Sequence, residues 1–207
     1  IGTRIYKDRS RMTRKVIIDT KNRIFDDFFK IDESRLSYEK FDGSMSPFVR
    51  RLNFERGDSV AALVLNRDTR KVLLVNQFKY PTLEKGPGWI TEVVAGSLGP
   101  HEDPEVAVRR EVLEEIGYRI ETIEPIARFY VSPGGTSERI WAYYAEVVNK
   151  GKEGPGGGSP DENEDIQTVE ISLDELDACL SEGCMQDAKT ILALLWLQRR
   201  IVQHGIP

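Results

Sequence analysis

The chain has 207 residues, of which 30% are charged and 40% hydrophobic, and its formal net charge is −5. This composition is typical of a soluble globular protein, and no apolar run is long enough to span a bilayer. An acidic chain also lacks the excess of Lys and Arg on which binding to a nucleic-acid backbone depends. The net charge therefore argues against a broad surface that binds nucleic acid, but it is compatible with a local basic patch that binds one small anionic ligand.

The first 15 residues, IGTRIYKDRSRMTRK, are basic but include neither an apolar core nor a small-residue cleavage site. They therefore lack the features of a secretory signal peptide. We expect a cytoplasmic location.

The few cysteines and histidines limit the chemistry that the chain can perform. Cys179 and Cys184 have no companion pair, and His101 and His204 are the only histidines. Two reduced thiols explain the cysteines better than a zinc site does. Two histidines and two cysteines also offer few residues for Ser-His or Cys-His catalysis. We therefore expect carboxylates to perform any acid-base chemistry.

The amino-terminal quarter of the chain predicts a small antiparallel sheet. Its apolar and aromatic runs are separated by turn signals, with Asp42-Gly43 as one hairpin turn. The runs cover residues 16–18, 25–31, 36–41 and 48–54. Such a sheet is only marginally stable alone, so we expect it to pack on the rest of the chain or on a second copy.

The remainder of the chain alternates predicted strands with predicted helices, which indicates an α/β fold with helices packed on a mixed sheet. A flexible acidic loop over residues 151–165 interrupts this pattern. The strands are predicted at residues 59–65, 71–78, 89–95, 126–131, 139–148 and 166–171. The helices are predicted at residues 103–117, 173–181 and 187–202.

The first of these helices has recognisable ends and a recognisable buried stripe. Asp103 can cap it, Pro104 suits its first turn, and Gly117 ends it. The predicted stripe consists of Val108, Val112 and Ile116, flanked by Val106 and Leu113.

Three acids of the same helix, Glu111, Glu114 and Glu115, fall together on another side. Each such like-charge pair costs a few tenths of a kcal/mol in an isolated helix, and a solvated face would more often interleave lysines. A hard divalent cation such as Mg²⁺ would supply the missing positive charge. On composition and periodicity alone, a solvated acidic face explains the pattern equally well.

The spacing of these acids decides between the two interpretations. Residues 96–118 read GSLGPHEDPEVAVRREVLEEIGY. The positions of Gly96, Glu102, Arg110-Glu111, Glu114-Glu115 and Gly117 resemble the Nudix box, the signature of the Nudix hydrolases. Tyr118 departs from the aliphatic residue that is usual there, at a packing position. The resemblance implies an α/β/α sandwich that hydrolyses the pyrophosphate of a nucleoside diphosphate linked to another moiety.

The resemblance also implies roles for residues of the box. Glu111 and Glu115 would be the principal ligands of Mg²⁺, for which Mn²⁺ could substitute, with Glu114 beside them. The backbone carbonyl of Ala95 or Gly96 could complete the metal shell. Glu102 and Arg110 would hold the box together, Arg110 by pairing with glutamate.

Two further segments resemble the branch of ADP-ribose pyrophosphatases and their GDP-mannose- and UDP-glucose-cleaving relatives. Residues 132–138 read SPGGTSE; this is a tight turn in any case, and the resemblance adds that Glu138 faces the site. Residues 161–166 read DENEDI and follow three glycines. Taken alone this is a mobile linker, but in the branch such a loop closes over the metals. Glu162 would then be the catalytic base, with Glu164 as the alternative, and we expect a mobile lid.

The resemblance extends to the amino-terminal sheet, which is similar to a three-stranded unit that exchanges between subunits in this branch. It implies a homodimer, with residues 1–56 as the dimer-forming subdomain and residues 57–207 as the Nudix hydrolase domain. The implied substrate-binding residues are Arg50, Arg51, Lys79 and Phe28. Lys79 stands where many relatives have Arg, which weakens the expectation of a bidentate contact.

These observations predict a Mg²⁺-dependent hydrolase of nucleoside diphosphate sugars, with ADP-ribose cleaved to AMP and ribose 5-phosphate as the preferred reaction. The close alternative is hydrolysis of GDP-mannose or UDP-glucose. An alternative from another class is a non-catalytic Nudix domain that senses a nucleotide sugar, against which the complete box counts. Neither nucleic acid nor membrane is an expected partner.

Overall fold

The computed structural model describes residues 14–205, and of Glu162 it describes the backbone alone. The chain divides into two compact units. The first contains the described residues up to Arg56 together with Ser132–Ser137, and the second contains Gly57–Val131 and the described residues from Glu138 onward. No helix in the described part of the chain is long and apolar enough to cross a membrane.

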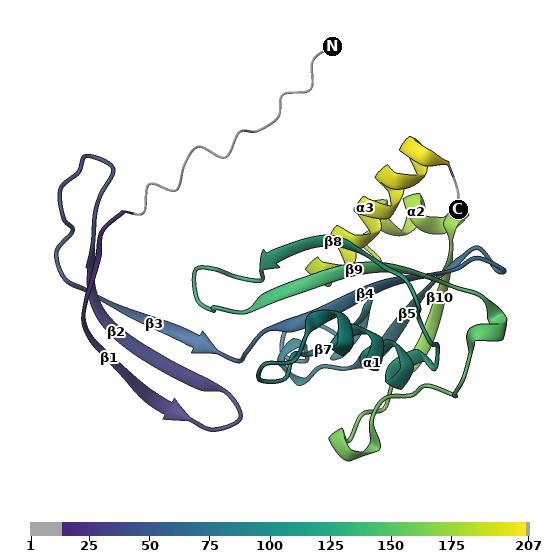
Figure 1. Cartoon of the computed structure of the whole chain (residues 1–207), viewed down its shortest axis with the longest axis horizontal. Coiled ribbons are helices and arrows are strands. Elements are labelled where there is room, and N and C mark those ends of the chain that lie inside the picture. Colours follow the sequence, from purple (N-terminus) through teal and green to yellow (C-terminus); the bar gives the residue numbers. More distant parts are fainter. Residues whose placement is uncertain (1–13, 206–207) are drawn as a thin grey trace, which may run out of the picture. The chain divides into compact units, whose positions relative to one another are not determined.

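The first unit is a three-stranded antiparallel sheet with β2 in the centre (Figure 1). Its strands are β1 (Val16–Asp26), β2 (Lys30–Tyr38) and β3 (Val49–Glu55). The predicted sheet is therefore confirmed, but the run over residues 25–31 is not one strand. It contains the first hairpin turn, in which the Asp27 N–H donates to the Phe29 carbonyl at 3.1 Å. Asp27 Oδ1 also accepts the N–H of Phe28 at 2.6 Å, which holds this turn.

The segment Ser132–Ser137 joins the first unit through β3. The Phe54 N–H donates to the Gly135 carbonyl at 2.8 Å. Ser137 Oγ lies 3.1 Å from Asn53 Nδ2 and 2.5 Å from Glu55 Oε2. Nothing in the local sequence indicates this pairing, because the segment follows β3 by nearly eighty residues.

The second unit is built on a mixed seven-stranded sheet in which β4 is central (Figure 1). β9 is parallel to β4 and the other pairs are antiparallel. All eight residues of β4 are buried, as expected of an apolar strand covered on both faces. The strands are β4 (Ser59–Asn66), β5 (Lys71–Phe78), β6 (Trp89–Glu92), β7 (Val94–Ser97), β8 (Ile123–Tyr130), β9 (Arg139–Val147) and β10 (Gln167–Ser172).

Helices cover both faces of this sheet, so the predicted α/β/α sandwich is confirmed (Figure 1). Alternate side chains of β4 point to opposite faces. Val60, Ala62 and Val64 pack in the core beneath α1 (Pro104–Ile116). Ala61, Leu63 and Leu65 pack in the core beneath α2 (Leu176–Ser181) and α3 (Ala188–His204). Short 3-10 helices lie at η1 (Tyr80–Thr82), η2 (Asn149–Gly151), η3 (Pro160–Glu162) and η4 (Leu173–Glu175).

The prediction of a single strand over residues 89–95 is wrong, because the chain changes partner at Val93. β6 pairs with β5, whereas β7 pairs with the first half of β4. Val93 between them is buried, and its N–H donates to Thr190 Oγ1 of α3 at 2.9 Å. This step places Gly96 on the central strand pair, opposite Val60 and next to α1.

Candidate active site

The helix α1 is fixed at both ends as the sequence predicts. Asp103 Oδ1 accepts the N–H of Glu105 at 2.8 Å, and Pro104 occupies the first turn. At the other end Gly117 is left-handed, with φ +74°, and its N–H donates to the Leu113 carbonyl at 3.1 Å. Glycine adopts this conformation without strain, so the length of the helix follows from its own sequence.

The buried face of α1 differs from the predicted one. Its stripe is confirmed and fully buried: Val108, Val112 and Ile116. The prediction that Val106 and Leu113 flank this stripe is wrong, since they are 59% and 41% exposed. The buried flank consists instead of Ala107, Glu111 and Glu115. Two of the three acids therefore point into the protein.

Glu115 is the most unusual of these acids. Its side chain is 0% exposed, and neither carboxylate oxygen has a hydrogen-bond partner in the described part of the chain. Burial, followed by the charges of Glu111, Glu92 and Glu164, raises its pKa to about 9. Burying a carboxylate without a partner is costly. A hard cation would supply the charge that the surrounding residues do not.

Glu111 fills the space that Gly96 leaves open in β7. A Cβ atom at Gly96 would lie 1.9 Å from both Cδ and Oε1 of Glu111, so no larger residue fits beside this carboxylate. Burial raises the pKa of Glu111 to about 7, although the nearby Arg110 acts to lower it. The close approach explains why a glycine begins the motif.

Arg110 holds three glutamates of the box. Its Nη1 lies 2.9 Å from Glu111 Oε1 and 3.0 Å from Glu114 Oε2, and its Nε lies 3.4 Å from Glu102 Oε1. Glu102 also accepts the N–H of Gly99 at 2.9 Å, a bond that lowers the pKa of the Glu102 carboxyl. One arginine thus ties the loop before α1 to the acidic side of the helix.

The acids fit a hard divalent cation by chemistry, although they do not yet surround one. Within residues 14–205, no three acidic, His or Cys side chains whose positions are described converge in a metal-holding geometry. Glu111 is engaged by Arg110 instead. A cation bound at Glu115 would therefore compete with Arg110 for the Glu111 carboxylate.

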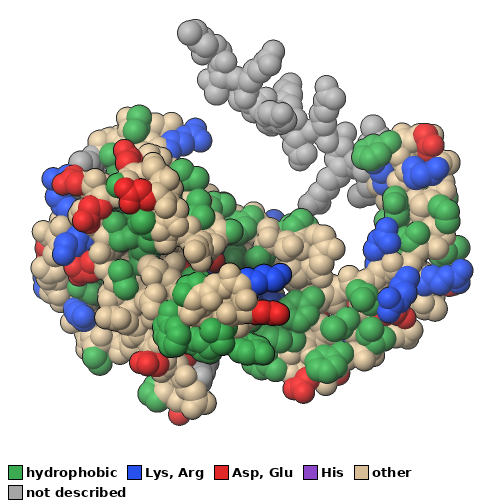
Figure 2. Space-filling model, turned by 180° about the vertical axis from the view of Figure 1, so that it is seen from behind, with side chains coloured by type: hydrophobic (Ala, Val, Ile, Leu, Met, Phe, Trp, Pro, Cys, Tyr) green, Lys and Arg blue, Asp and Glu red, His purple; other side chains and the backbone are tan. Residues whose placement is uncertain are grey.

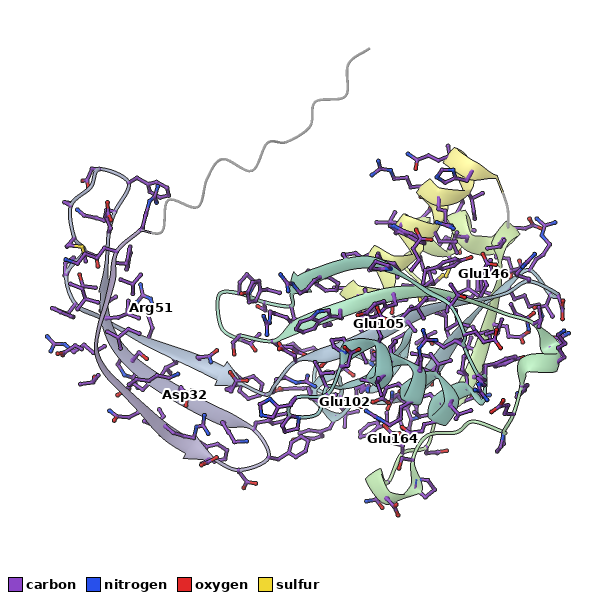
Figure 3. All side chains as sticks on the ribbon, viewed as in Figure 1. Asp32, Arg51, Glu102, Glu105, Glu146 and Glu164 are labelled. Atoms are coloured by element: carbon purple, nitrogen blue, oxygen red, sulfur yellow. The ribbon has the colours of Figure 1, made fainter. Side chains whose placement is uncertain are left out.

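The segment that carries the predicted lid glutamates lies beside α1. The charge of Glu164 acts to raise the pKa of Glu111 and of Glu115, so its carboxylate lies within electrostatic reach of both. Figure 3 shows Glu164 close to α1, on the side of the sheet where Glu102 also lies. The Glu164 side chain is held by the Ser159 N–H, at 2.9 Å from Oε2. The side chain of Glu162 lies outside the described part, and its backbone belongs to η3.

A buried charge cluster beside Glu115 escapes sequence reasoning. Glu92, at the end of β6, is 3% exposed and pairs with Lys189 of α3. Its Oε1 also lies 3.2 Å from Lys79 Nζ. Both Glu92 and Lys79 act on the pKa of Glu115, in opposite directions. A charged residue at the end of a buried strand is a signal in the sequence, but its partner 97 positions later is not.

The other predicted residues are divided between the two units. Arg50, Arg51 and Phe28 belong to the first, where Arg50 pairs with Glu33 and Phe28 is 83% exposed. In the second unit Glu138 is 6% exposed and accepts the Ser59 hydroxyl at 2.9 Å. Ala95 lies in β7, opposite Ala61. The roles in binding that the resemblance implies for these residues stay predictions.

Comparison with known proteins places the chain in a family. Residues 55–194 match the NUDIX domain. A GDP-mannose pyrophosphatase of Cronobacter sakazakii is 37% identical over 153 residues, which are 73% of this chain and 78% of that protein. An ADP-ribose pyrophosphatase of Escherichia coli strain K12 is 36% identical over 186 residues, 88% of each chain.

Among solved structures, an ADP compounds hydrolase has the same fold. It matches with a TM-score of 0.72 over 93% of this chain and 97% of its own, at 17% identity. The matched NUDIX domain covers well over half of the sequence and contains the whole motif of residues 96–117. The chain belongs to the Nudix family.

Proposed function

We propose that this chain hydrolyses the pyrophosphate bond of nucleoside diphosphate sugars with the help of Mg²⁺, and that ADP-ribose is its preferred substrate. The observation that carries the proposal is the fully buried, unpartnered carboxylate of Glu115 beside Glu111. Burying this carboxylate without a partner costs free energy of folding. A merely solvated acidic surface does not require such burial, whereas a metal site does.

Glu111 and Glu115 would hold the metal, with Glu114 beside them and the backbone carbonyl of Ala95 as a further ligand. When bound, Mg²⁺ would neutralise charge on the diphosphate and lower the pKa of the attacking water. Mn²⁺ could take its place. Arg110 would hold the carboxylates together and oriented, as its three ion pairs suggest.

A glutamate of the DENEDI segment would accept the proton of the attacking water. Glu162 is the first candidate from the family resemblance. The nearness of Glu164 to Glu111 and Glu115 supports Glu164 as the alternative. Glu115 itself would act through the metal rather than as the base, because it is too deeply buried to meet bulk water.

Arg50, Arg51, Lys79 and Glu138 would bind the polar parts of the substrate, and Phe28 would stack on its base. Phe28 and Arg51 are exposed and therefore free to meet a ligand. Figure 3 labels Arg51 on the first unit. Lys79 is 38% exposed at its side chain, so its ammonium group could serve both Glu92 and a phosphate.

The chain would act as a homodimer formed through the first unit. Several large hydrophobic side chains of this unit are exposed, and Figure 2 shows hydrophobic groups spread over its surface. They include Val16, Ile18, Ile24, Phe25, Phe41, Phe48 and Leu52. A three-stranded sheet with so much apolar surface is poorly suited to water on both faces. A cytoplasmic location stays a prediction, which fractionation of cells would test.

The preference for ADP-ribose rests on identity among the matches that span most of the chain, which is 36% for the ADP-ribose pyrophosphatase and 32% and 30% for two GDP-mannose pyrophosphatases. The GDP-mannose pyrophosphatase of Cronobacter sakazakii is 37% identical over 153 residues, so GDP-mannose is the second candidate. The test is turnover of ADP-ribose, GDP-mannose and UDP-glucose by the purified chain with Mg²⁺. Faster turnover of GDP-mannose would reverse the preference. Tight binding without any turnover would favour a nucleotide-sugar sensor.

A matched pair of variants tests the assignment of the site. Glu115→Gln removes the buried carboxyl group, whereas Glu105→Gln makes the same change at an exposed position in the first turn of α1. We expect Glu115→Gln to lose activity by several orders of magnitude and Glu105→Gln to keep it. Equal activity of the two variants would refute the site.

A further inference from the structure

The glycine-rich segment over residues 154–158 caps the end of α1. The last carbonyl groups of a helix have no partner within it. Here the Gly157 N–H donates to the Glu115 carbonyl at 2.9 Å, and the Gly158 N–H donates to the Glu114 carbonyl at 3.0 Å. The Gly154 N–H likewise donates to the Gly117 carbonyl at 3.1 Å. The segment therefore binds the backbone of two acidic residues of the site.

The glycines of this segment are required by close packing. A Cβ atom at Gly156 would lie 2.6 Å from the Glu115 carbonyl oxygen, and one at Gly117 would lie 2.1 Å from the Gly154 carbonyl oxygen. Real Cβ atoms essentially never come within 3.0 Å of another residue's atoms. The glycine-rich composition, which is typical of a flexible linker, here allows the backbone of this segment to pack closely against the backbone at the end of α1.

The same segment also contacts Glu164. A Cβ atom at Gly158 would lie 2.6 Å from the Cβ of Glu164 and 2.8 Å from its Oε2. The neighbouring Ser159 N–H donates to that oxygen, and the Ile166 N–H donates to the Gly157 carbonyl at 3.2 Å. Both sides of residues 157–159 are therefore occupied, one by α1 and the other by the loop that carries Glu164.

We propose that residues 156–159 form a positioning bridge, which fixes the carboxylate of Glu164 relative to Glu111 and Glu115. Gly158 contacts both α1 and Glu164. Its N–H donates to the Glu114 carbonyl of α1, and its α-carbon, which carries no side chain, lies beside Glu164. The bridge acts through Glu164 and touches neither substrate nor metal. It rests on the proposed function, in which these acids serve a metal-dependent hydrolysis.

Two neighbouring glycines provide a matched test. Gly157 and Gly158 both have positive φ, +108° and +89°, so alanine is strained at either position. Only at Gly158 would the new methyl group meet Glu164, since at Gly157 the nearest atom is the Ile166 carbonyl oxygen at 4.0 Å. The methyl group at Gly158 would also lie 3.0 Å from Ile166 Cδ1, so a difference between Gly158→Ala and Gly157→Ala is assigned to Glu164 only with the double substitution described below.

Displacing the carboxylate of Glu164, whose charge acts on Glu111 and Glu115, should weaken Mn²⁺ binding, and displacing a candidate base should lower kcat. We expect both losses to be roughly ten- to a hundredfold relative to Gly157→Ala, the usual range for residues around the ligands of a metal. KM should change little, because the substrate is not contacted. Mn²⁺ binding is measured by electron paramagnetic resonance on the purified variants, and thermal melts compare their folding. Equal Mn²⁺ affinity and equal kcat of the two variants would overturn the proposal.

A double substitution tests whether the effect passes through Glu164. If it does, Gly158→Ala adds little to Glu164→Gln, since groups that act together are not additive. Additive losses would overturn the proposal. Ser159→Pro is the second variant if Gly158→Ala fails to fold. It removes the N–H that holds Glu164, and the φ of Ser159, −90°, is near the range of proline; wild-type Mn²⁺ affinity in this variant would also count against the bridge.

The two proposals can fail separately. Absence of turnover by the wild-type chain on every substrate would refute the proposed function. The comparison of Mn²⁺ affinity between Gly157→Ala and Gly158→Ala would still decide whether the bridge exists.

Discussion

Replacing Gly96 by alanine tests whether β7 must leave room for the carboxylate of Glu111. The backbone of Gly96 is not in the left-handed region, so alanine adopts it without strain. The whole effect therefore comes from one methyl carbon, 1.9 Å from Cδ and Oε1 of Glu111. To restore an ordinary contact of 3.4 Å, the carboxylate must retreat by about 1.5 Å.

A displacement of this size has a predictable cost in rate. Misplacing a reacting or metal-binding group by about 1 Å can lower turnover about a hundredfold, which corresponds to about 2.7 kcal/mol of activation free energy. We expect Gly96→Ala to lose at least this much kcat with ADP-ribose and Mg²⁺. Mn²⁺ affinity should fall with it, because Glu111 is a proposed ligand.

Gly151→Ala is the control for Gly96→Ala. Its new methyl group would meet nothing nearer than the Arg119 carbonyl oxygen at 3.9 Å, and its φ is also ordinary. Melting temperatures of both variants separate a loss of fold from a loss of function. If Gly96→Ala folded and kept the wild-type kcat and Mn²⁺ affinity, the assignment of Glu111 to the metal would be wrong.

Three further predictions concern stability and assembly. In metal-free buffer at pH 7, Glu115→Gln should be more stable than wild type by about 3 kcal/mol in urea unfolding, because it removes a carboxyl whose pKa burial raises from 4.5 to about 9. This gain in the free energy of unfolding should grow as pH rises from about 5 towards 9. A gain that is independent of pH would contradict the reasoning. Lys189→Met leaves Glu92 buried without its main partner and should cost about 3 kcal/mol, whereas Lys85→Met at an exposed site should cost almost nothing. Ile18→Glu places a charge on an exposed apolar position of β1 and should shift sedimentation towards the monomer without changing the melting of dilute protein; an unchanged dimer would exclude this surface.

Strong local signals made much of the fold predictable. β4 and β5 are continuous apolar runs bounded by a turn, and their predicted limits differ from the observed ones by at most one residue. The ends of α1 follow from Asp103, Pro104 and Gly117. In each of these elements the tertiary structure agrees with what the local sequence prefers.

The site departs from local preference, and the hydrophobic pattern gives a partly wrong buried face of α1 there. A helical wheel ranks residues by hydrophobicity, so it places Val106 and Leu113 inside and the acids outside. The protein does the reverse with Glu111 and Glu115. Such conflicts between local preference and burial are expected where a protein gives up stability for function. The spacing of the box identified the acids, but hydrophobicity could not tell which of them are buried.

Long-range contacts account for the remaining differences. The break at Val93 arises because β6 pairs with β5 whereas β7, which follows it, pairs with β4. The pairing of Glu92 with Lys189 joins β6 to α3. The composition of residues 154–158 predicts flexibility, yet their hydrogen bonds and close contacts with α1 explain the glycines. A single sequence does not record which distant backbone a glycine must approach.

The pairing of Ser132–Ser137 with β3 has a consequence for cutting the chain. The first unit is connected covalently to the second at three points, after residues 56, 131 and 137, rather than at one. A protease that cleaved only after Arg56 would leave the amino-terminal fragment attached through the Phe54–Gly135 backbone bond and the side chains around Ser137. Deleting residues 1–56 would leave the β8–β9 connection without the strand on which it rests. Each unit is thus built from two separate segments of the chain, so a single cut does not separate one unit from the other.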